Sequence, residues 1–142
     1  MYCAKTTITK SSFMQRIPTV YFQESPIHGR GIFTYDNIPK GSLIEICPVI
    51  VLPPEQISYL EKTLLYHYYF TWGDQQASAA ILLGFGSLYN HAIQCNAEYI
   101  MDYEQRTMDV YALRDIKAGE EITFNYNGEL GSQKAISELP ES

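Results

Sequence analysis

The sequence lacks several features that define common protein classes. Its three cysteines, Cys3, Cys47 and Cys95, are odd in number and never form a C-x-x-C pair, so neither a disulfide framework nor a zinc site is indicated. No stretch approaches the roughly 20 apolar residues of a membrane span, and no apolar run follows the lysines near the amino terminus. The simplest expectation is an intracellular protein in a reducing compartment, cytoplasmic or nuclear.

Basic residues are also in the minority. Ten lysines and arginines against 16 acidic residues give a formal net charge of -6 and a pI near 4.9. Nucleic-acid binding depends largely on basic side chains that neutralise phosphates, so no direct nucleic-acid partner is expected. A basic protein segment is a more suitable partner, although the same charge could simply keep the protein soluble.

The composition is that of a globular protein rich in aromatic residues. Hydrophobic residues make up 46% of the 142, and the chain has 12 tyrosines and 6 phenylalanines. This length suits one domain with one core. We expect an N-terminal arm over residues 1–18, a domain over 19–128 and a polar tail over 129–142.

Local patterns predict a mainly β fold with one or two short helices. Residues 42–52 are rich in β-branched side chains, and Pro48 should confine this strand to a sheet edge or a break. Residues 97–103 and 107–113 read as a hairpin. Apolar residues at helical spacing after Pro53 predict one helix over 54–67, and no other helix is asserted.

A weak internal repeat supports the β assignment. Residues 36–44 are similar to residues 114–122, and in both an isoleucine precedes a glycine turn that leads into a strand. The repeat occurs too few times for a solenoid. We therefore expect two similar strand-turn-strand corners in one compact sheet system.

Three segments carry candidate chemistry. Residues 29–33 place two glycines around Arg30, which suits a hairpin turn or a close approach of the backbone to a ligand, and the third glycine of a nucleotide-binding G-x-G-x-x-G is missing. Residues 89–96 contain an amide and an imidazole. Residues 119–126 form an acidic, then apolar, stretch that ends in tyrosine. Together the last two segments predict a polar site against a β scaffold.

In this order, the three segments resemble the glycine, asparagine-histidine and closing tyrosine motifs of the SET domain of protein-lysine methyltransferases. The resemblance implies a SET fold (β-clip) of small twisted sheets with a C-terminal pseudoknot, where residues 90–91 and 124–126 meet. It also implies that S-adenosyl-L-methionine and a substrate lysine enter one narrow channel from opposite faces.

The resemblance assigns roles residue by residue. The cofactor-binding residues would be Arg30, Gly31, Asn90, His91 and Tyr126, with Asn90 at the amino-acid end of the cofactor and the His91 ring mainly bracing the crossing. A purely structural histidine is the ordinary alternative for His91, and Asn96 is expected to be a structural capping group and not a ligand contact.

On the substrate side, Tyr126 would be the principal catalytic residue and Tyr99 a second one. Phe124 and Tyr99 would line the lysine channel, and Phe124 would limit how many methyl groups fit. Each of these aromatics could instead be a core residue. No metal is implied. A lysine with a pKa near 10.4 must lose a proton before it attacks, which costs roughly 4 to 5 kcal/mol at neutral pH, and an apolar channel beside a sulfonium favours that loss.

The sequence also departs from the motifs. Ala92 stands where the family usually has serine, Asn125 replaces the usual acid, and the cysteine-rich zinc segments that often flank the domain are absent. Something else must close the channel. The candidates are the tail around Leu130, the aromatic residues 66–70 with Trp72, or a second subunit in a homodimer.

Three functions therefore stay open. The first is a lysine methyltransferase acting on a basic protein, such as a histone. The second is a degenerate domain that binds a peptide or protein without catalysis. The third, a metal-dependent hydrolase using His28, His67 and His91, lacks any ligand spacing.

Overall fold

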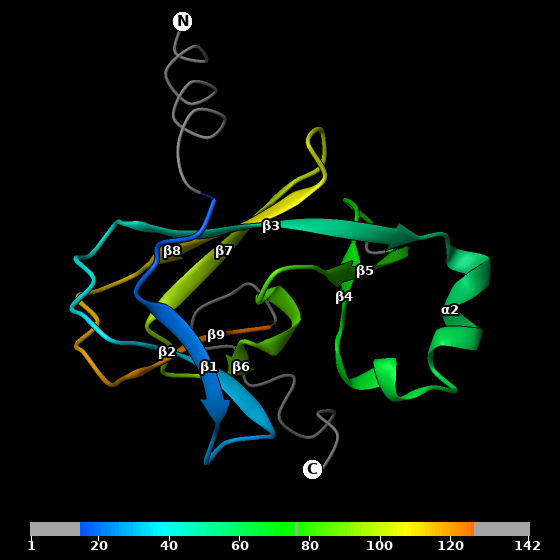
Figure 1. Cartoon of the computed structure of the whole chain (residues 1–142). Coiled ribbons are helices and arrows are strands. Elements are labelled where there is room, and N and C mark those ends of the chain that lie inside the picture. Colours follow the sequence, from blue (N-terminus) through cyan, green and yellow to red (C-terminus); the bar gives the residue numbers. More distant parts are fainter. Residues whose placement is uncertain (1–14, 76, 127–142) are drawn as a thin grey trace, which may run out of the picture.

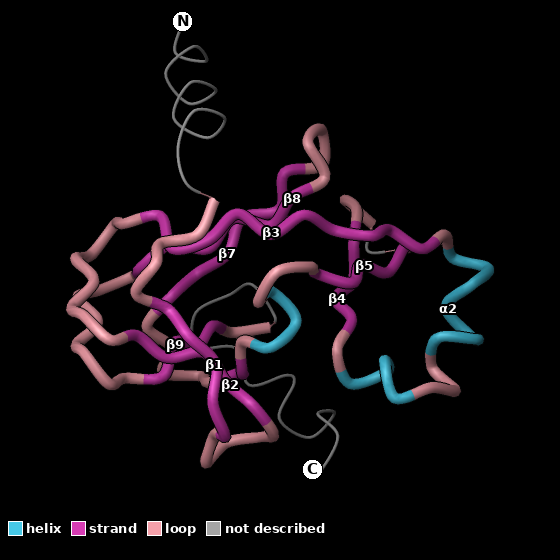
Figure 2. The backbone as a smooth tube through the Cα atoms, viewed as in Figure 1, coloured by secondary structure: helices cyan, strands magenta, loops and turns pink. Residues whose placement is uncertain are grey.

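Strands dominate the protein, whose computed structural model describes residues 15–75 and 77–126 (Figure 1). Figure 2 shows helical segments only as short pieces between strands. The strands are β1 (Val20–Glu24), β2 (Arg30–Thr34), β3 (Leu43–Leu52), β4 (Tyr69–Trp72), β5 (Ser78–Leu82), β6 (Asn90–His91), β7 (Ala97–Asp102), β8 (Thr107–Ala112) and β9 (Glu121–Phe124). The helical elements are α2 (Pro54–Leu60) and the 3-10 turns η1 (Leu64–His67) and η2 (Gly86–Leu88).

The strands form two sheets, with the orders β1-β2-β9-β6 and β4-β5-β3-β8-β7. Neighbouring strands are antiparallel except β6 and β9, which run parallel. The long strand β3 crosses the top of the molecule and links the region of β4, β5 and α2 to the region of β7, β8 and the smaller sheet (Figure 1). The predicted mainly β class is confirmed, as is the hairpin of β7 and β8.

The expected effect of Pro48 on β3 was wrong in part. The strand lies in the centre of its sheet, but it changes partner at the proline: residues 43–48 pair with β8, and residues 49–52 pair with β5. Pro48 has no N–H to donate, and its carbonyl accepts a 2.8 Å hydrogen bond from the Leu83 N–H. A central strand therefore tolerates proline where its pairing passes from one edge to the other.

The predicted helix over residues 54–67 is shorter than expected. It begins at Pro54 as predicted, but α2 ends at Leu60 and η1 follows as a separate turn. The Thr63 hydroxyl donates to the Leu60 carbonyl at 2.7 Å and accepts from the Leu65 N–H at 3.2 Å. Threonine thus ends one helical segment and caps the next, an alternative to helix continuation that hydroxyl side chains offer.

The hydrophobic core lies between the two sheets and reaches the strand β9. Ile32, Ile44, Met108, Ile122 and Phe124 are fully buried. Each such side chain contributes about 1.5–3 kcal/mol by leaving water. The two fully buried members of β9 tie the end of the described chain to the core and hold that strand in place.

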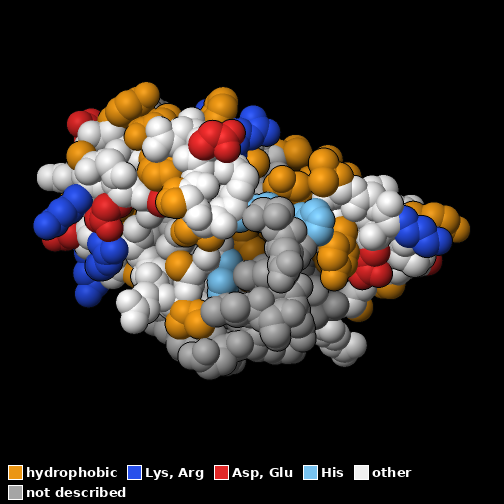
Figure 3. Space-filling view, turned by 90° about the horizontal axis from the view of Figure 1, so that it is seen from below, with side chains coloured by type: hydrophobic (Ala, Val, Ile, Leu, Met, Phe, Trp, Pro, Cys, Tyr) orange, Lys and Arg blue, Asp and Glu red, His pale blue; other side chains and the backbone are white. Residues whose placement is uncertain are grey.

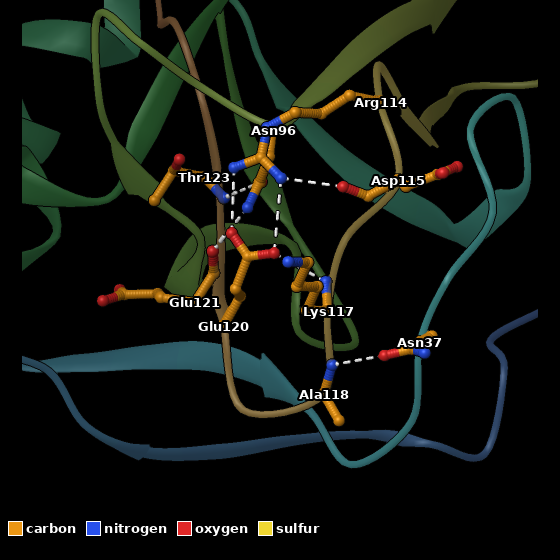
Figure 4. Close-up of polar contacts among 9 residues, drawn as sticks. All are labelled: Asn37, Asn96, Arg114, Asp115, Lys117, Ala118, Glu120, Glu121 and Thr123. Carbon is orange, nitrogen blue, oxygen red and sulfur yellow. Dashed lines mark hydrogen bonds and ion pairs between the residues drawn. The ribbon is translucent and has the colours of Figure 1, made fainter.

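The internal repeat in the sequence corresponds to two corners that face each other. Ile38 and Ile116 form an antiparallel bridge and exchange backbone hydrogen bonds of 2.7 and 2.9 Å. The side-chain oxygen of Asn37 accepts a 2.9 Å bond from the Ala118 N–H (Figure 4).

The reverse contact is present at the equivalent positions. The Lys40 N–H donates to the Asp115 carboxylate at 2.8 Å. Gly41 and Gly119, which follow at matching places, adopt φ values of 84° and 90° that glycine accepts without strain. The expected pair of similar corners is confirmed, and the two are related by approximate two-fold symmetry.

Parts of the predicted domain boundaries lie outside the described residues. The arm over 1–18 is described only from Gln15, where Arg16 bridges to Glu45. The tail over 129–142 is not described. In the described part of the chain, no helix is long and apolar enough to cross a bilayer.

Candidate functional site

The two polar segments found in the sequence meet where β6 and β9 pair. Asn90 lies opposite Thr123 and His91 opposite Phe124 in a parallel register. The Ala92 N–H then donates to the Phe124 carbonyl at 3.3 Å. This contact needs only the backbone, so alanine at this position leaves the crossing intact.

The His91 ring braces the crossing. Its Nδ1 accepts a 3.1 Å hydrogen bond from the Tyr126 N–H, and burial lowers the pKa of the imidazole below its ordinary value. Its Nε2 is buried without a hydrogen-bond partner among the described residues. A neutral ring with Nδ1 as acceptor is the form that this geometry requires.

Asn96 holds β9 by hydrogen bonds to the backbone of that strand. Its amide nitrogen donates to the Glu121 carbonyl at 2.8 Å, and its amide oxygen accepts from the Thr123 N–H at 2.9 Å (Figure 4). The side chain is 3% exposed. Both hydrogen bonds go to the backbone of β9, so Asn96 takes the structural role that the sequence favoured for it.

Tyr126 is anchored through Tyr89. The Tyr126 hydroxyl donates to the Tyr89 carbonyl at 2.6 Å, and the Tyr89 hydroxyl donates to the carboxylate of Glu45 at 2.8 Å. Burial, followed by the negative charge of Glu121, raises the pKa of the Tyr126 phenol well above its ordinary value. The phenol therefore stays protonated and acts as a hydrogen-bond donor.

Glu45 is a buried acid that the sequence did not reveal. It is 2% exposed, and besides Tyr89 its carboxylate accepts from the Phe85 N–H at 2.9 Å and from Arg16 at 3.5 Å. These donors satisfy a charge that would otherwise be costly to bury. Burial and the nearby Glu45 raise the pKa of the Tyr89 phenol well above its ordinary value, so this hydroxyl also remains a donor.

Aromatic rings surround the Tyr126 side chain. The ring centroids of Phe124 and Tyr99 are 5.0 Å apart, and Phe70 of β4 lies 5.1 Å from Tyr126 and 5.9 Å from Tyr99. The Tyr99 hydroxyl donates to the Tyr126 carbonyl at 2.8 Å, and burial raises its pKa to about 12. The result is an apolar wall that carries two oriented phenols.

On the other side of the crossing, Asn90 meets the turn between β1 and β2. Its amide nitrogen donates to the Glu121 carboxylate at 2.8 Å, to the His28 carbonyl at 3.0 Å and, at 3.5 Å, to the Arg30 carbonyl. The Arg30 guanidinium lies 5.5 Å from the Phe22 ring. The glycine motif and the asparagine motif therefore lie side by side, as the resemblance implied.

Comparison with known proteins identifies the family. A family model described as SET domain matches residues 29–127. The chain belongs to the SET-domain family. Over 120 residues it is 31% identical to a Schizosaccharomyces pombe protein named histone-lysine N-methyltransferase, H3 lysine-37 specific, covering 81% of this chain and 80% of that protein. It is 30% identical over 132 residues to a Chaetomium globosum histone-lysine N-methyltransferase named as H3 lysine-4 specific, covering 86% of this chain and 12% of that longer protein.

Solved structures agree on the SET fold. A Plasmodium falciparum protein described as a histone methyltransferase is 28% identical and superposes with a TM-score of 0.63, over 84% of this chain and all of that one. A ctPRC2 structure in an autoinhibited conformation, bound to S-adenosylmethionine, has a TM-score of 0.66 over 87% of this chain and 18% of that one. Its identity is 21%, so it supports the fold alone.

The alternative metal site would use the histidines His28, His67 and His91. Figure 3 shows histidine side chains among hydrophobic ones on the lower face, with acidic and basic side chains mainly at its margins. Within residues 15–75 and 77–126, no three histidine, cysteine or acidic side chains gather closely enough to hold a metal ion. The hydrolase alternative therefore gains no support from this part of the chain.

Sequence reasoning missed the residues that hold the site from a distance. Glu45, Ser25 and Glu121 were given no individual role, although Glu121 lies inside the closing motif. Their contacts join residues 31 to 96 positions apart, and no local pattern encodes such contacts. Phe70 belonged to the aromatic run proposed to close the channel, and it does pack against Tyr126.

Proposed function

We propose that this chain is an S-adenosylmethionine-dependent protein-lysine N-methyltransferase. The observation that carries the proposal is the meeting of β6 and β9, which places a polar cradle around Asn90 on one side and the phenols of Tyr126 and Tyr99 on the other. The names of its relatives as histone-lysine methyltransferases support the same reaction.

The residues around Asn90 fit the amino-acid end of the cofactor. Gly31 lies against the side chains of Asn90 and Glu121, where a Cβ atom would collide with the Glu121 carboxylate, and the carbonyls of His28 and Arg30 line the same place. Carbonyl oxygens at this place suit a ligand that carries an ammonium, because they can only accept hydrogen bonds. S-adenosylmethionine supplies a methyl group on a cationic sulfur. Arg30, Gly31, Asn90 and the backbone of His91 would hold it.

The aromatic wall fits the substrate lysine. A protonated lysine is disfavoured in surroundings made of Phe124, Phe70, Tyr99 and Tyr126, because burial penalises the charged form. The amine would give its proton to water before it enters. Tyr126 would then orient the neutral amine with its hydroxyl held on the Tyr89 carbonyl, and the gain comes from alignment rather than from a general base.

The position of Phe70 supports the proposal that the aromatic residues 66–70 help to close the channel. It contacts Tyr126 from β4, which belongs to the other sheet. The region around Leu130 lies outside the described residues, and closure by a second copy of the chain stays a prediction.

The substrate class follows from charge and from the relatives. A protein with a net charge of -6 suits a basic lysine-containing segment, and we propose a histone as the first substrate to test. A histone substrate in chromatin would require a nuclear location.

The experiment is incubation of the chain with isotopically labelled S-adenosylmethionine and core histones, followed by mass spectrometry. We expect label on lysine with the native chain and far less with Tyr126→Phe. Equal labelling by both would refute the role of Tyr126. Cofactor or histone binding with no labelling of any histone would favour the peptide-binding alternative, motivated by Ala92 and Asn125.

A further inference from the structure

The carboxylate of Glu121, at the start of β9, joins three segments of the chain. Its two oxygens lie 2.9 and 2.8 Å from the hydroxyl of Ser25 in the β1–β2 turn. One of them also accepts the 2.8 Å hydrogen bond from the Asn90 amide nitrogen. The backbone carbonyl of the same residue holds Asn96. Glu121 therefore sits between the glycine turn and the asparagine of β6.

The surroundings fix which way the Asn90 amide faces. Its nitrogen contacts the Glu121 carboxylate and the carbonyls of His28 and Arg30, all of which can only accept hydrogen bonds. Turning the amide over would place its oxygen against these three acceptors. The donor end is thus committed to the protein, and the acceptor Oδ1 is the end left to a ligand.

Gly31 adds an independent observation. A Cβ at this position would meet the Glu121 carboxylate and would lie 3.0 Å from the Asn90 amide nitrogen. Any side chain at residue 31 would therefore displace the carboxylate from Asn90. The glycine is needed so that Glu121 can reach the amide.

We infer that Glu121 is a positioning residue that holds Asn90 so that its amide oxygen accepts from the α-ammonium of the cofactor. The inference rests on the proposed function and deepens it. Glu121 would set the affinity for the amino-acid end of the cofactor and leave the affinity for its adenosine end unchanged.

The test compares two ligands by calorimetry. S-adenosylhomocysteine carries the amino-acid end, whereas 5′-methylthioadenosine has the same nucleoside without it. We expect Glu121→Ala to weaken binding of the first by roughly 10- to 30-fold and of the second by less than about 2-fold, on the scale of one lost charge-assisted contact. Glu121→Gln keeps an acceptor oxygen and should fall between the native chain and Glu121→Ala.

The chain offers a matched control in the adjacent residue. Glu120 pairs with Arg114 at 2.9 Å, and Figure 4 shows the Glu121 side chain extending away from that pair. Glu120→Ala should change the affinity for neither ligand. Ser25→Ala, which removes a partner of the carboxylate in an exposed turn, should weaken only S-adenosylhomocysteine, by about 2- to 5-fold. If Glu121→Ala does not fold, Ser25→Ala provides the test in its place.

A double-mutant cycle tests whether Glu121 acts through Asn90. In an Asn90→Ala background, Glu121→Ala should cause little further loss, since the amide that it orients is gone. Equal weakening of both ligands by Glu121→Ala, no weakening of either, or fully additive losses would overturn the inference. A native chain that binds neither ligand would overturn the proposed function, and the inference with it.

Discussion

The hydroxyl of Tyr126 donates a 2.6 Å hydrogen bond to the backbone carbonyl of Tyr89. The side chain of Tyr89 is itself fully buried, and its hydroxyl is held by the Glu45 carboxylate. The phenol proposed to orient the substrate amine is therefore supported by a fixed backbone atom, one residue before Asn90, which is proposed to bind the cofactor.

Replacing Tyr126 with phenylalanine removes that hydrogen bond and little else. We expect methyl transfer to fall by about 100-fold, the usual scale for a lost alignment. The free energy of unfolding should drop by only about 1 kcal/mol. Single-turnover rates and urea unfolding check the two values. Tyr35→Phe, at a tyrosine that is 65% exposed, is the matched control and should change neither.

The number of methyl groups added should depend on Phe124. This ring is fully buried and packs against Tyr99, so an added hydroxyl would occupy space beside the amine. We expect Phe124→Tyr to shift products toward monomethyl-lysine, at a cost of about 1–3 kcal/mol in stability if the hydroxyl finds no partner. Mass spectrometry of the product series measures this, and an unchanged distribution would contradict it.

The pH dependence of transfer should follow the substrate and not the enzyme. Burial raises the pKa of Tyr126 well above its ordinary value and that of Tyr99 to about 12, so both stay protonated in the alkaline range used for assays. We expect kcat/KM to rise about tenfold per pH unit between pH 7.5 and 9.5, as the free lysine with a pKa near 10.4 loses its proton. A plateau below pH 8.5 would show that another group controls the step.

His91 should make the fold sensitive to acid. Burial lowers its pKa in the folded protein, so the unfolded chain takes up a proton first as the pH falls below about 6.5. Stability is therefore present above that pH and is lost as the pH falls toward the lower, folded-state value. Protonation of Nδ1 would also break the bond from the Tyr126 N–H.

Thermal unfolding between pH 7.5 and 5 measures the effect. The native chain should lose several degrees over this range, and His91→Gln should lose less. His28→Gln, in the β1–β2 turn, is the control and should keep the native acid sensitivity. If His91→Gln and the native chain respond alike, the assignment is wrong.

Replacing Asn96 should lower the stability of the fold, because both of its side-chain hydrogen bonds go to the backbone of β9. Asn96→Ala removes two hydrogen bonds and leaves the Thr123 N–H and the Glu121 carbonyl without them, at an expected cost of about 2–4 kcal/mol. Urea unfolding gives the value. Asn37→Ala loses one exposed contact to the Ala118 N–H and should cost no more than about 1 kcal/mol. A larger loss of stability for Asn37→Ala than for Asn96→Ala would contradict this prediction.

The sequence predicts β3, β7, β8 and the two-corner arrangement, because these depend on local patterns, but it does not predict β4 or β5. Alternating apolar residues mark β7 and β8, and the paired isoleucines at 38 and 116 mark corners that bridge each other. It overextends the helix after Pro53, since apolar spacing continues past Leu60 while the Thr63 hydroxyl ends the helix. It also misplaces Pro48, because periodicity does not show that β3 changes partner there.

The site is only half visible in the sequence. Asn90 and Tyr126 stand in motifs, so their types and order suffice to propose them. The groups that hold them, Glu45, Ser25 and Glu121, act across long stretches of chain and look like ordinary surface acids and a turn serine. Only the tertiary structure brings them to Tyr89 and Asn90.

The position of β9 also bears on how the protein forms. Ile32 near the start of the domain pairs with Ile122 near its end, and β9 inserts between β2 and β6. Pairings between such distant residues close late and slowly in folding. A nascent chain that has not yet released β9 would therefore lack Tyr126, the brace on His91 and two fully buried core residues at once. Cofactor binding would therefore begin only once β9 has paired with its two neighbours.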